Sequence, residues 1–194
     1  MSDRTPPAAG FALFDTAIGR CGVAWTERGI TRIALPEASD AVSRQRLARS
    51  TPGAEAPAPP AIAAAIDRIV AHVGGEPAAL DEIALDMDGI PAFHAEVYAA
   101  ARQIPSGRPV SYGALARSLG KPGAARAIGQ AMGANPFPIV VPCHRVLAAN
   151  YATGGFSAHG GVETKARLLA AEGFTLPTQP ELPFAAPVSP RRPR

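Results

Sequence analysis

The sequence has few cysteines, few aromatic residues and no long apolar run, and these absences exclude several classes of protein. Only Cys21 and Cys143 occur among 194 residues, so a disulfide-stabilised scaffold is excluded and both are expected to be free thiols. No apolar run reaches the roughly 18 residues that a membrane span needs, and the first residues lack the order of a signal peptide. We therefore expect a cytoplasmic protein without a membrane partner.

What is present is typical of a globular protein with many turns. Hydrophobic residues make up 47% of the chain and charged residues 18%, beside 19 Gly and 21 Pro. The length predicts one or two domains.

The net charge of +3 combines an acidic first half with a basic second half. Residues 1–90 carry 8 Arg against 12 Asp and Glu, whereas residues 91–176 carry 8 Lys and Arg against 3 Glu. Because phosphate contacts need clustered cations, the pattern favours contact between the second half and a polyanion. A solvated charged face is the alternative, and charge alone does not decide between the two.

Residues 1–90 predict a small N-terminal α/β domain. Alternating apolar residues and glycines predict strands at 10–17, 21–26 and 29–35, arranged as an antiparallel meander. Helices are predicted at 37–50 and from Pro60 to 73, separated by a proline-rich loop at 51–60. A further strand is predicted near 83–87.

Residues 91–176 have a mainly helical pattern and form the second predicted domain. Ser111 is a good N-cap for a helix at 112–119, and a second helix is predicted from Ala124 to about Met132. Two short helices joined by a glycine-containing turn are the helix-turn-helix pattern, with Arg126 where such proteins meet DNA. Many helix pairs of this kind bind nothing, so the pattern alone is weak.

The segment from Asn135 to Val146 predicts a reactive thiol. A short apolar strand between prolines is expected to deliver Cys143 and His144 to its end. Neighbouring imidazole and guanidinium groups lower the pKa of a thiol, so we expect Cys143 to be a nucleophile. The alternative is a buried, inert cysteine. A carboxylate commonly orients such a histidine, and spacing alone does not choose between Glu163 and Glu172.

Five ordered motifs resemble those of one protein family. Pro142-Cys143-His144-Arg145-Val146, preceded by Asn135-Pro136, resembles the active-site signature of the O6-alkylguanine-DNA alkyltransferases, also called methylated-DNA-protein-cysteine methyltransferases. Four more segments are similar to the family's other motifs, in order: Ile104-Pro105-x-Gly107, Val110-Ser111-Tyr112-Gly113-x-Leu115-Ala116, Ala124-Ala125-Arg126-Ala127-Ile128-Gly129 and Lys165-x-x-Leu168-Leu169-x-x-Glu172-Gly173. The resemblance covers residues 83–175, and five ordered motifs do not coincide by chance.

The resemblance implies irreversible transfer of an alkyl group from O6 of guanine to Cys143, once per protein molecule and without a cofactor. It implies that His144 activates the thiol through a water and that Glu172 orients His144. Asn135 is implied to hold the turn before the active-site strand. The implied fold is α+β, with a ribonuclease H-like first domain and a helical second domain.

The resemblance also implies a partner, double-stranded DNA bound through its minor groove. Arg126 would fill the place of a flipped base, and Tyr112 would assist extrusion and donate to the departing guanine. The implied DNA-binding residues include small ones along the second helix, namely Ala124, Ala125, Ala127 and Gly129. The implied guanine pocket is lined by Met132, Val146, Phe156 and Ser157. We expect a monomer, with cooperative binding to DNA left open.

Several features depart from the family pattern. Phe156 replaces the usual tyrosine, and Ala158-His159 are inserted beside it, so the range of alkyl groups accepted is left open, as is activity on O4-alkylthymine. Cys21 has no partner at metal spacing, so no zinc site is expected, and His72 and His94 are expected to be surface or core residues. The proline-rich tail, 177–194, is expected to be disordered.

Two other functions are compatible with parts of the sequence. A DNA-binding protein of the same fold that senses lesions would need no reactive cysteine, but Cys143 is present. A Cys-His hydrolase would need an oxyanion site and an acyl pocket, for which the sequence gives no signal.

Overall fold

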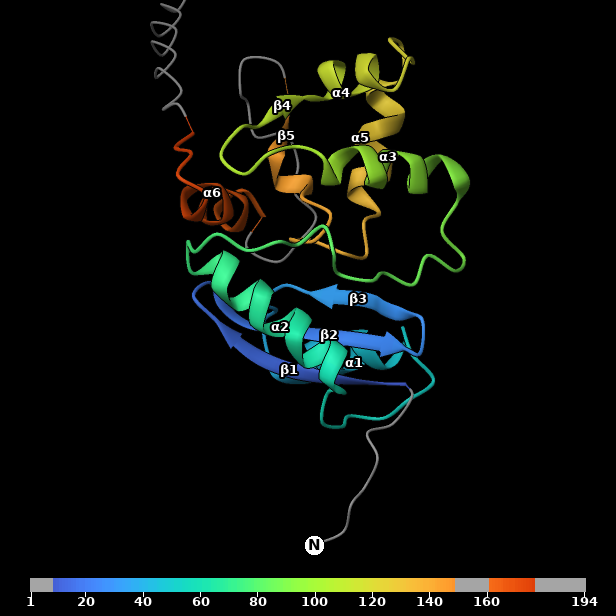
Figure 1. Ribbon diagram of the computed structural model, residues 1–194, viewed down its shortest axis with the longest axis vertical. Helices are drawn as coiled ribbons and strands as arrows, with labels where there is room; N and C mark the ends of the chain where they lie inside the picture. Colours follow the sequence, from blue (N-terminus) through green and yellow to red (C-terminus); the bar gives the residue numbers. More distant parts are fainter. Residues whose placement is uncertain (1–8, 149–160, 177–194) are drawn as a thin grey trace, which may run out of the picture.

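The computed structural model describes residues 9–148 and 161–176, which form one three-stranded sheet, a two-stranded ladder and the helices α1 to α6. Figure 1 shows the larger sheet with α1 and α2 in one half of the molecule and α3 to α6 in the other. Within these residues, none of the helices has the length and apolar character to cross a membrane.

The larger sheet confirms the predicted meander. Strands β1 (Gly10–Thr16), β2 (Gly19–Thr26) and β3 (Gly29–Ala34) pair antiparallel in chain order. Gly29 opens β3 with φ of 138°, and a Cβ there would lie 2.6 Å from the carbonyl oxygen of Ala84. Only glycine fits this close approach, so the residue that separates β2 from β3 in the sequence is also required sterically.

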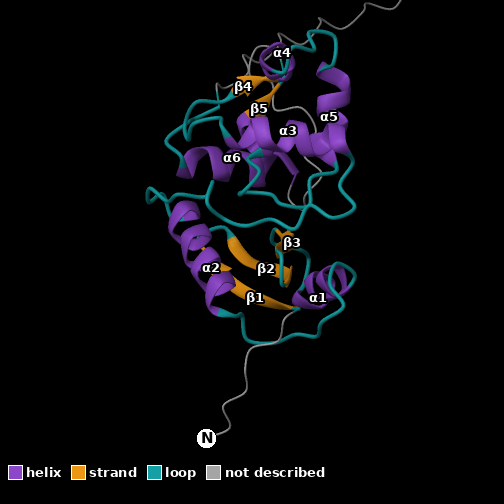
Figure 2. Ribbon diagram, turned by 45° about the vertical axis from the view of Figure 1, so that its right-hand side comes forward, coloured by secondary structure: helices purple, strands orange, loops and turns teal. Residues whose placement is uncertain are grey.

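Two helices cover opposite faces of this sheet. Side chains alternate between the faces of a strand, so Val23 and Trp25 of β2 point one way and Ala24 the other. Val23 and Trp25 share a buried cluster with residues of α2 (Pro60–Val73), whereas Ala24 packs with Leu47 of α1 (Asp40–Ala48). Figure 2 shows α1 and α2 on either side of the strands.

The segment near 83–87 corrects one prediction. It contributes a single bridge, between Leu85 and Ile30 of β3, and no strand. The Thr26 hydroxyl donates to the Asp86 carboxylate at 2.6 Å, and Arg28 donates to it at 3.1 Å. These contacts tie Asp86 to the turn between β2 and β3, and the segment pairs with β3 at Ile30 alone.

The helices of the second half confirm the predicted pattern. They are α3 (Ala92–Arg102), α4 (Tyr112–Ser118), α5 (Ala125–Gly133) and α6 (Gly161–Ala171). Ser111 caps α4 as predicted, since its hydroxyl accepts from the Ala114 amide at 3.1 Å. The short strands β4 (Val110–Ser111) and β5 (Val146–Leu147) pair in parallel beside α4.

One apolar core continues through both halves. Buried residues from the sheet, α2, α3, α5 and α6 belong to a single cluster, which includes Val23, Ile69, Val97, Ile128 and Leu168. Division of the chain near residue 90 stays a prediction.

Candidate active site

The segment between α5 and β5 is a compact turn, so the predicted active-site strand before Cys143 is wrong. Residues 138–140 form a turn, and Cys143–Arg145 form the 3-10 helix η1. Pro136, Pro138 and Pro142 have no N–H to donate to a sheet ladder, which explains why the apolar run does not extend as a strand.

Asn135 holds this turn with two hydrogen bonds. Its Oδ1 accepts from the Phe137 amide, and its Nδ2 donates to the Val141 carbonyl, each at 2.9 Å. Between them Ile139 has φ of 75°, an uncommon conformation for a β-branched residue. The two hydrogen bonds of the Asn135 side chain therefore hold the turn in shape, as backbone hydrogen bonds do in a helix or a sheet.

Cys143 is buried, and its pKa differs from the expectation. Burial raises the pKa of the Cys143 thiol, and the hydrogen bond from Asn135 and the charge of Lys165 only partly oppose it. The expected lowering by His144 and Arg145 is wrong because both side chains are directed to Glu172. Cys143 is therefore a neutral thiol at rest, and a base has to ionise it.

Lys165 is a functional candidate that sequence reasoning missed. This residue of α6 is 1% exposed, and its Nζ donates to the Val146 carbonyl at 2.8 Å. Burial lowers its pKa, while a charge on Cys143 raises it. The sequence feature that could have indicated this role is the position of a lysine on the apolar helix face that Leu168 and Leu169 form. Its positive charge would stabilise the thiolate of Cys143.

Two tyrosines lie within electrostatic range of the thiol. Burial raises the pKa of Tyr98, on α3, to about 12, and it also raises that of Tyr112; in both cases a charge on Cys143 adds to the increase. The Tyr98 hydroxyl donates to the Ala131 carbonyl at 2.9 Å. Both phenols therefore stay protonated, and because the Tyr98 hydrogen is directed to Ala131, Tyr112 is the candidate donor to the reacting group.

His144 pairs with Glu172, and this contact separates the two candidate glutamates. Its Nε2 lies 2.8 Å from Oε1 of Glu172, which follows the end of α6, whereas Glu163 is exposed on that helix. An ionised carboxylate only accepts, so Nε2 carries the hydrogen and the lone pair is on Nδ1. In the described part of the chain, Nδ1 is buried without a hydrogen-bond partner. It is the nitrogen available as a base.

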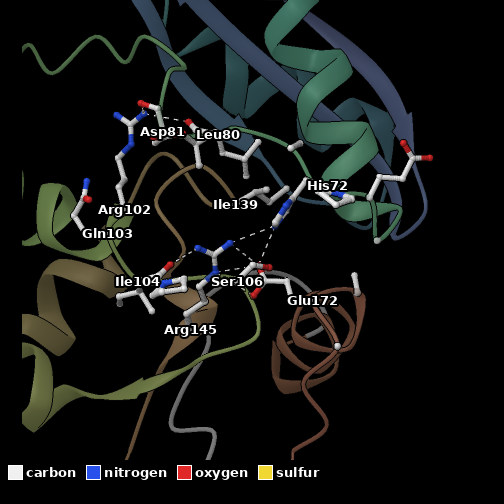
Figure 3. A pocket seen from close by; sticks show the side chains of 18 of the residues that line it. His72, Leu80, Asp81, Arg102, Gln103, Ile104, Ser106, Ile139, Arg145 and Glu172 are labelled. Carbon is white, nitrogen blue, oxygen red and sulfur yellow. Dashed lines mark hydrogen bonds and ion pairs between the residues drawn. The ribbon is translucent and has the colours of Figure 1, made fainter.

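Arg145 and His72 complete the surroundings of Glu172, as Figure 3 shows. Arg145 Nε donates to both carboxylate oxygens at 3.0 Å, and His72 Nε2 lies 2.9 Å from Oε1. Burial opposes the charge, but hydrogen bonds from His144, His72 and Arg145 hold the pKa of Glu172 well below its usual range. Glu172 therefore stays an anion.

His72 was expected to be a surface or core residue, and its contact with Glu172 was missed. It is buried on α2, and the helix presents it on the same side as Ile62, Ile69 and Val73. The sequence feature that could have indicated this contact is a polar residue at helical spacing among apolar ones.

The same groups do not make a good metal site. His72, His144 and Glu172 each offer a ligand atom within 4.8 Å of the others. However, the guanidinium of Arg145 lies 2.8 Å from Oε1 of Glu172 and 3.4 Å from Nε2 of His72. A divalent ion would meet this positive charge, so we assign no metal to these residues.

The residues expected to meet DNA lie on α5 and beside it. Arg126 is exposed, and within the described ranges its side chain makes no hydrogen bond or ion pair. Ala124, Ala125, Ala127 and Gly129 are partly exposed, and a Cβ at Gly129 would lie 3.9 Å from the Tyr112 ring. Small residues thus leave the backbone of α5 accessible.

Of the expected pocket residues, the structure describes two. Met132, on α5, and Val146, in β5, are buried. Phe156, Ser157 and the inserted pair Ala158-His159 lie outside the described residues, as does the tail 177–194.

The sequence and the structure are similar to those of known proteins. Residues 92–174 match a family model described as "6-O-methylguanine DNA methyltransferase, DNA binding domain". The chain is 46% identical over 110 residues to a methylated-DNA--protein-cysteine methyltransferase of Salmonella typhimurium, a match that covers 57% of this chain and 63% of the relative. A protein of the same name from Mycobacterium tuberculosis is 41% identical over 121 residues, which cover 62% of this chain and 71% of the relative.

A solved structure shows the same fold. The crystal structure of Mycobacterium tuberculosis OGT in complex with DNA superposes with a TM-score of 0.68 at 34% identity, covering 84% of this chain and 92% of that one. The chain is therefore similar to these proteins both in sequence and in the arrangement of its elements.

Proposed function

Because the chain belongs to the 6-O-methylguanine DNA methyltransferase family, we propose that it repairs DNA by moving an alkyl group from O6 of guanine to Cys143. One observation carries the proposal: His144 is held by Glu172 through Nε2, which leaves the lone pair of Nδ1 buried beside the residue that bears the thiol. This is the nucleophile, base and orienting group of a covalent mechanism.

The first step ionises the thiol. Since burial raises the pKa of Cys143, the proton has to pass to a nearby base, and Nδ1 of His144 can accept it through one water. The imidazolium that forms is stabilised by Glu172, and the thiolate by Lys165. Each of the two charges that form, positive on His144 and negative on Cys143, therefore has a group of opposite charge close to it.

The second step transfers the alkyl group. The sulfur of Cys143 attacks the alkyl carbon, an S–C bond forms, and the bond from that carbon to O6 breaks. Guanine leaves with the electron pair of the broken bond, and the protonated hydroxyl of Tyr112 donates a hydrogen bond to it. The proton that Cys143 passed to His144 balances the negative charge of the departing guanine. Because the thioether on Cys143 has no route back to a thiol, each molecule reacts once. The chain and the DNA supply every atom, so the mechanism uses no cofactor.

DNA recognition is assigned to α4 and α5 as a helix-turn-helix in the minor groove. A base inside the duplex cannot reach a buried thiol, so the damaged nucleotide has to flip out, at a cost of a few kcal/mol. Arg126, exposed on α5 and without an internal partner in the residues described, is suited to fill the vacated place. Small residues along α5 permit close approach to the groove.

Loss of the lesion from DNA tests the proposal. A duplex with one O6-methylguanine is mixed with equimolar protein, and the remaining O6-methylguanine is measured by nucleoside chromatography for wild type, Cys143→Ser and Cys21→Ser. We expect wild type and Cys21→Ser to remove the lesion and Cys143→Ser to bind without removing it. Binding without removal by wild type would make the protein a lesion sensor and overturn the proposal.

A further inference from the structure

We propose that His72 is a positioning residue for alkyl transfer. His72 holds the Glu172 carboxylate in place, and Glu172 in turn orients His144. Through His72, α2 takes part in positioning the base. The inference rests on the proposed function. His72 precedes the segment that matches the family model, which begins at residue 92. The family model therefore does not describe this residue.

Two histidines converge on one carboxylate oxygen. Nε2 of His72 and Nε2 of His144 lie 2.9 Å and 2.8 Å from Oε1 of Glu172. The side chains of His72, His144 and Glu172 are 7%, 0% and 1% exposed, so water does not compete for these contacts. Since the ionised carboxylate can only accept, both imidazoles donate through Nε2.

His72 adds a second contact beside that of Arg145 on Oε1 of Glu172, with its Nε2 3.4 Å from Nη2 of Arg145. Arg145 binds both carboxylate oxygens from η1 and is itself anchored to the Ile104 carbonyl at 2.5 Å. His72 approaches the same carboxylate from α2, in the other half of the molecule (Figure 3). With a donor from each half, Oε1 is fixed where His144 can donate to it, because rotation of the carboxylate would break the contact with His72.

The shared oxygen also couples His72 to the basicity of His144. Each hydrogen bond that Oε1 accepts disperses its negative charge, so the bond from His72 weakens the attraction of Glu172 for an imidazolium at His144. His144 is faced by Glu172, by Arg145 from η1 and by His72 from α2. Cys143 is faced by Lys165 from α6, Tyr98 from α3 and Tyr112 from α4. Among these groups, only His72 comes from the first 90 residues.

Three variants separate positioning from packing. His72→Leu removes the donor, His72→Gln keeps an N–H donor at the place of Nε2, and Val73→Ala removes buried volume from the neighbouring position of α2, where Val73 is 2% exposed. The single-turnover rate of demethylation of an O6-methylguanine duplex is measured for each from pH 5 to pH 9.

We expect His72→Leu to slow transfer about tenfold at neutral pH, the lower end of what supporting partners of a site contribute. The acid limb of its rate profile should move to higher pH, because His144 then holds its proton more tightly. His72→Gln should restore most of the rate and the position of the limb, and Val73→Ala should leave the limb in place. A His72→Leu profile that matches Val73→Ala, or no rescue by glutamine, would overturn the proposal.

A spectroscopic measurement keeps this outcome separate from that of the proposed function. Nitrogen chemical shifts of the imidazole of His144 are recorded in ¹⁵N-histidine-labelled wild type and the three variants without DNA. We expect the Nε2–H tautomer in wild type and altered shifts only in His72→Leu. If wild type moves no methyl group yet these shifts change as expected, the proposed function fails and the positioning role stands. Unchanged shifts in His72→Leu contradict the positioning role, whatever the activity.

Discussion

Cys143 combines a neutral resting state with a base held ready beside it. Burial protects such a thiol from adventitious electrophiles, since the thiolate is the reactive form. In the proposed mechanism, His144 supplies the base only while Glu172 is charged and correctly placed. At the scale of single residues, the reactivity of the site therefore depends on a buried anion whose partners come from α2 and η1.

Replacement of Glu172 by glutamine should lower stability and alter its pH dependence. The substitution leaves Arg145 buried without a counter-charge, which costs about 3–5 kcal/mol. The folded pKa of Glu172 lies below the unfolded value of about 4.3, so the stability it contributes is complete above that pH and is lost as pH falls further. Urea unfolding at pH 7 and pH 3, well below the unfolded pKa, should show a smaller acid loss in Glu172→Gln than in wild type.

Glu163→Gln is the matched control, because Glu163 is exposed on α6. It should change stability by less than about 0.5 kcal/mol at both pH values. Equal acid losses in wild type and Glu172→Gln would contradict the assigned charge state.

The sequence predicted the nucleophile, base and orienting group of the proposed mechanism, Cys143, His144 and Glu172, to different extents. Local pattern indicated Cys143 and His144, and the choice of Glu172 over Glu163 came from the resemblance to a family. His72 and Lys165 could not be assigned, because their roles arise from contacts across 100 and 19 residues of chain, respectively. The thiol pKa was predicted in the wrong direction because burial cannot be read from adjacent residues.

At the scale of elements, periodic segments were predicted and irregular ones were not. The helices and the meander follow from apolar spacing, glycine turns and caps such as Ser111. The turn from Asn135 to η1 has an apolar composition like that of a strand, but its prolines and the Asn135 bonds determine its shape. A similar composition at 83–87 gave one bridge only.

Asn135→Ala should destabilise the protein and slow transfer. It leaves the buried Phe137 amide without its partner, at about 1–3 kcal/mol, whereas the Val141 carbonyl keeps the hydrogen bond that it accepts from the Cys143 amide at 2.8 Å. We expect about 1–3 kcal/mol less stability in urea unfolding and a loss of demethylation rate, because Cys143 follows this turn. Gln130→Ala, at an exposed position of α5, is the control; equal stability of the two variants would refute the role of the turn.

Arg126→Ala should separate base extrusion from chemistry. We expect demethylation of a duplex to slow about 10- to 100-fold, in keeping with a flipping cost of a few kcal/mol, while reaction with free O6-methylguanine changes less than about twofold. Arg68→Ala removes the same charge from α2, where Arg68 pairs with Glu82 at 2.9 Å, and should affect neither reaction. Equal slowing on both substrates would contradict the assignment of Arg126.

At the scale of the whole molecule, the shared core binds the two halves together. Arg167 of α6 donates to the carbonyls of Ala17 and Ile18 at the turn between β1 and β2, and Ile33 of β3 donates to the Pro136 carbonyl at 2.8 Å. The contact between His72 and Glu172 spans the same boundary. The first half thereby contacts the candidate active site as well as packing against the second half.

The halves should therefore unfold together. Trp25 is the only tryptophan, lies in the first half and is fully buried, so its fluorescence reports the sheet, whereas far-ultraviolet circular dichroism reports mainly the helices. We expect the two signals to give the same urea midpoint. A separate midpoint for Trp25 would show independent domains and would weaken the structural link through His72.

The central claim is that Cys143 receives the alkyl group, and intact-protein mass spectrometry after reaction with a duplex carrying O6-trideuteromethylguanine tests it most directly. We predict one labelled methyl group per molecule, located on Cys143 by peptide mapping, and none after incubation of wild type with undamaged duplex or of Cys143→Ser with the labelled duplex. A label on Cys21, or an unmodified protein beside repaired DNA, would contradict the account.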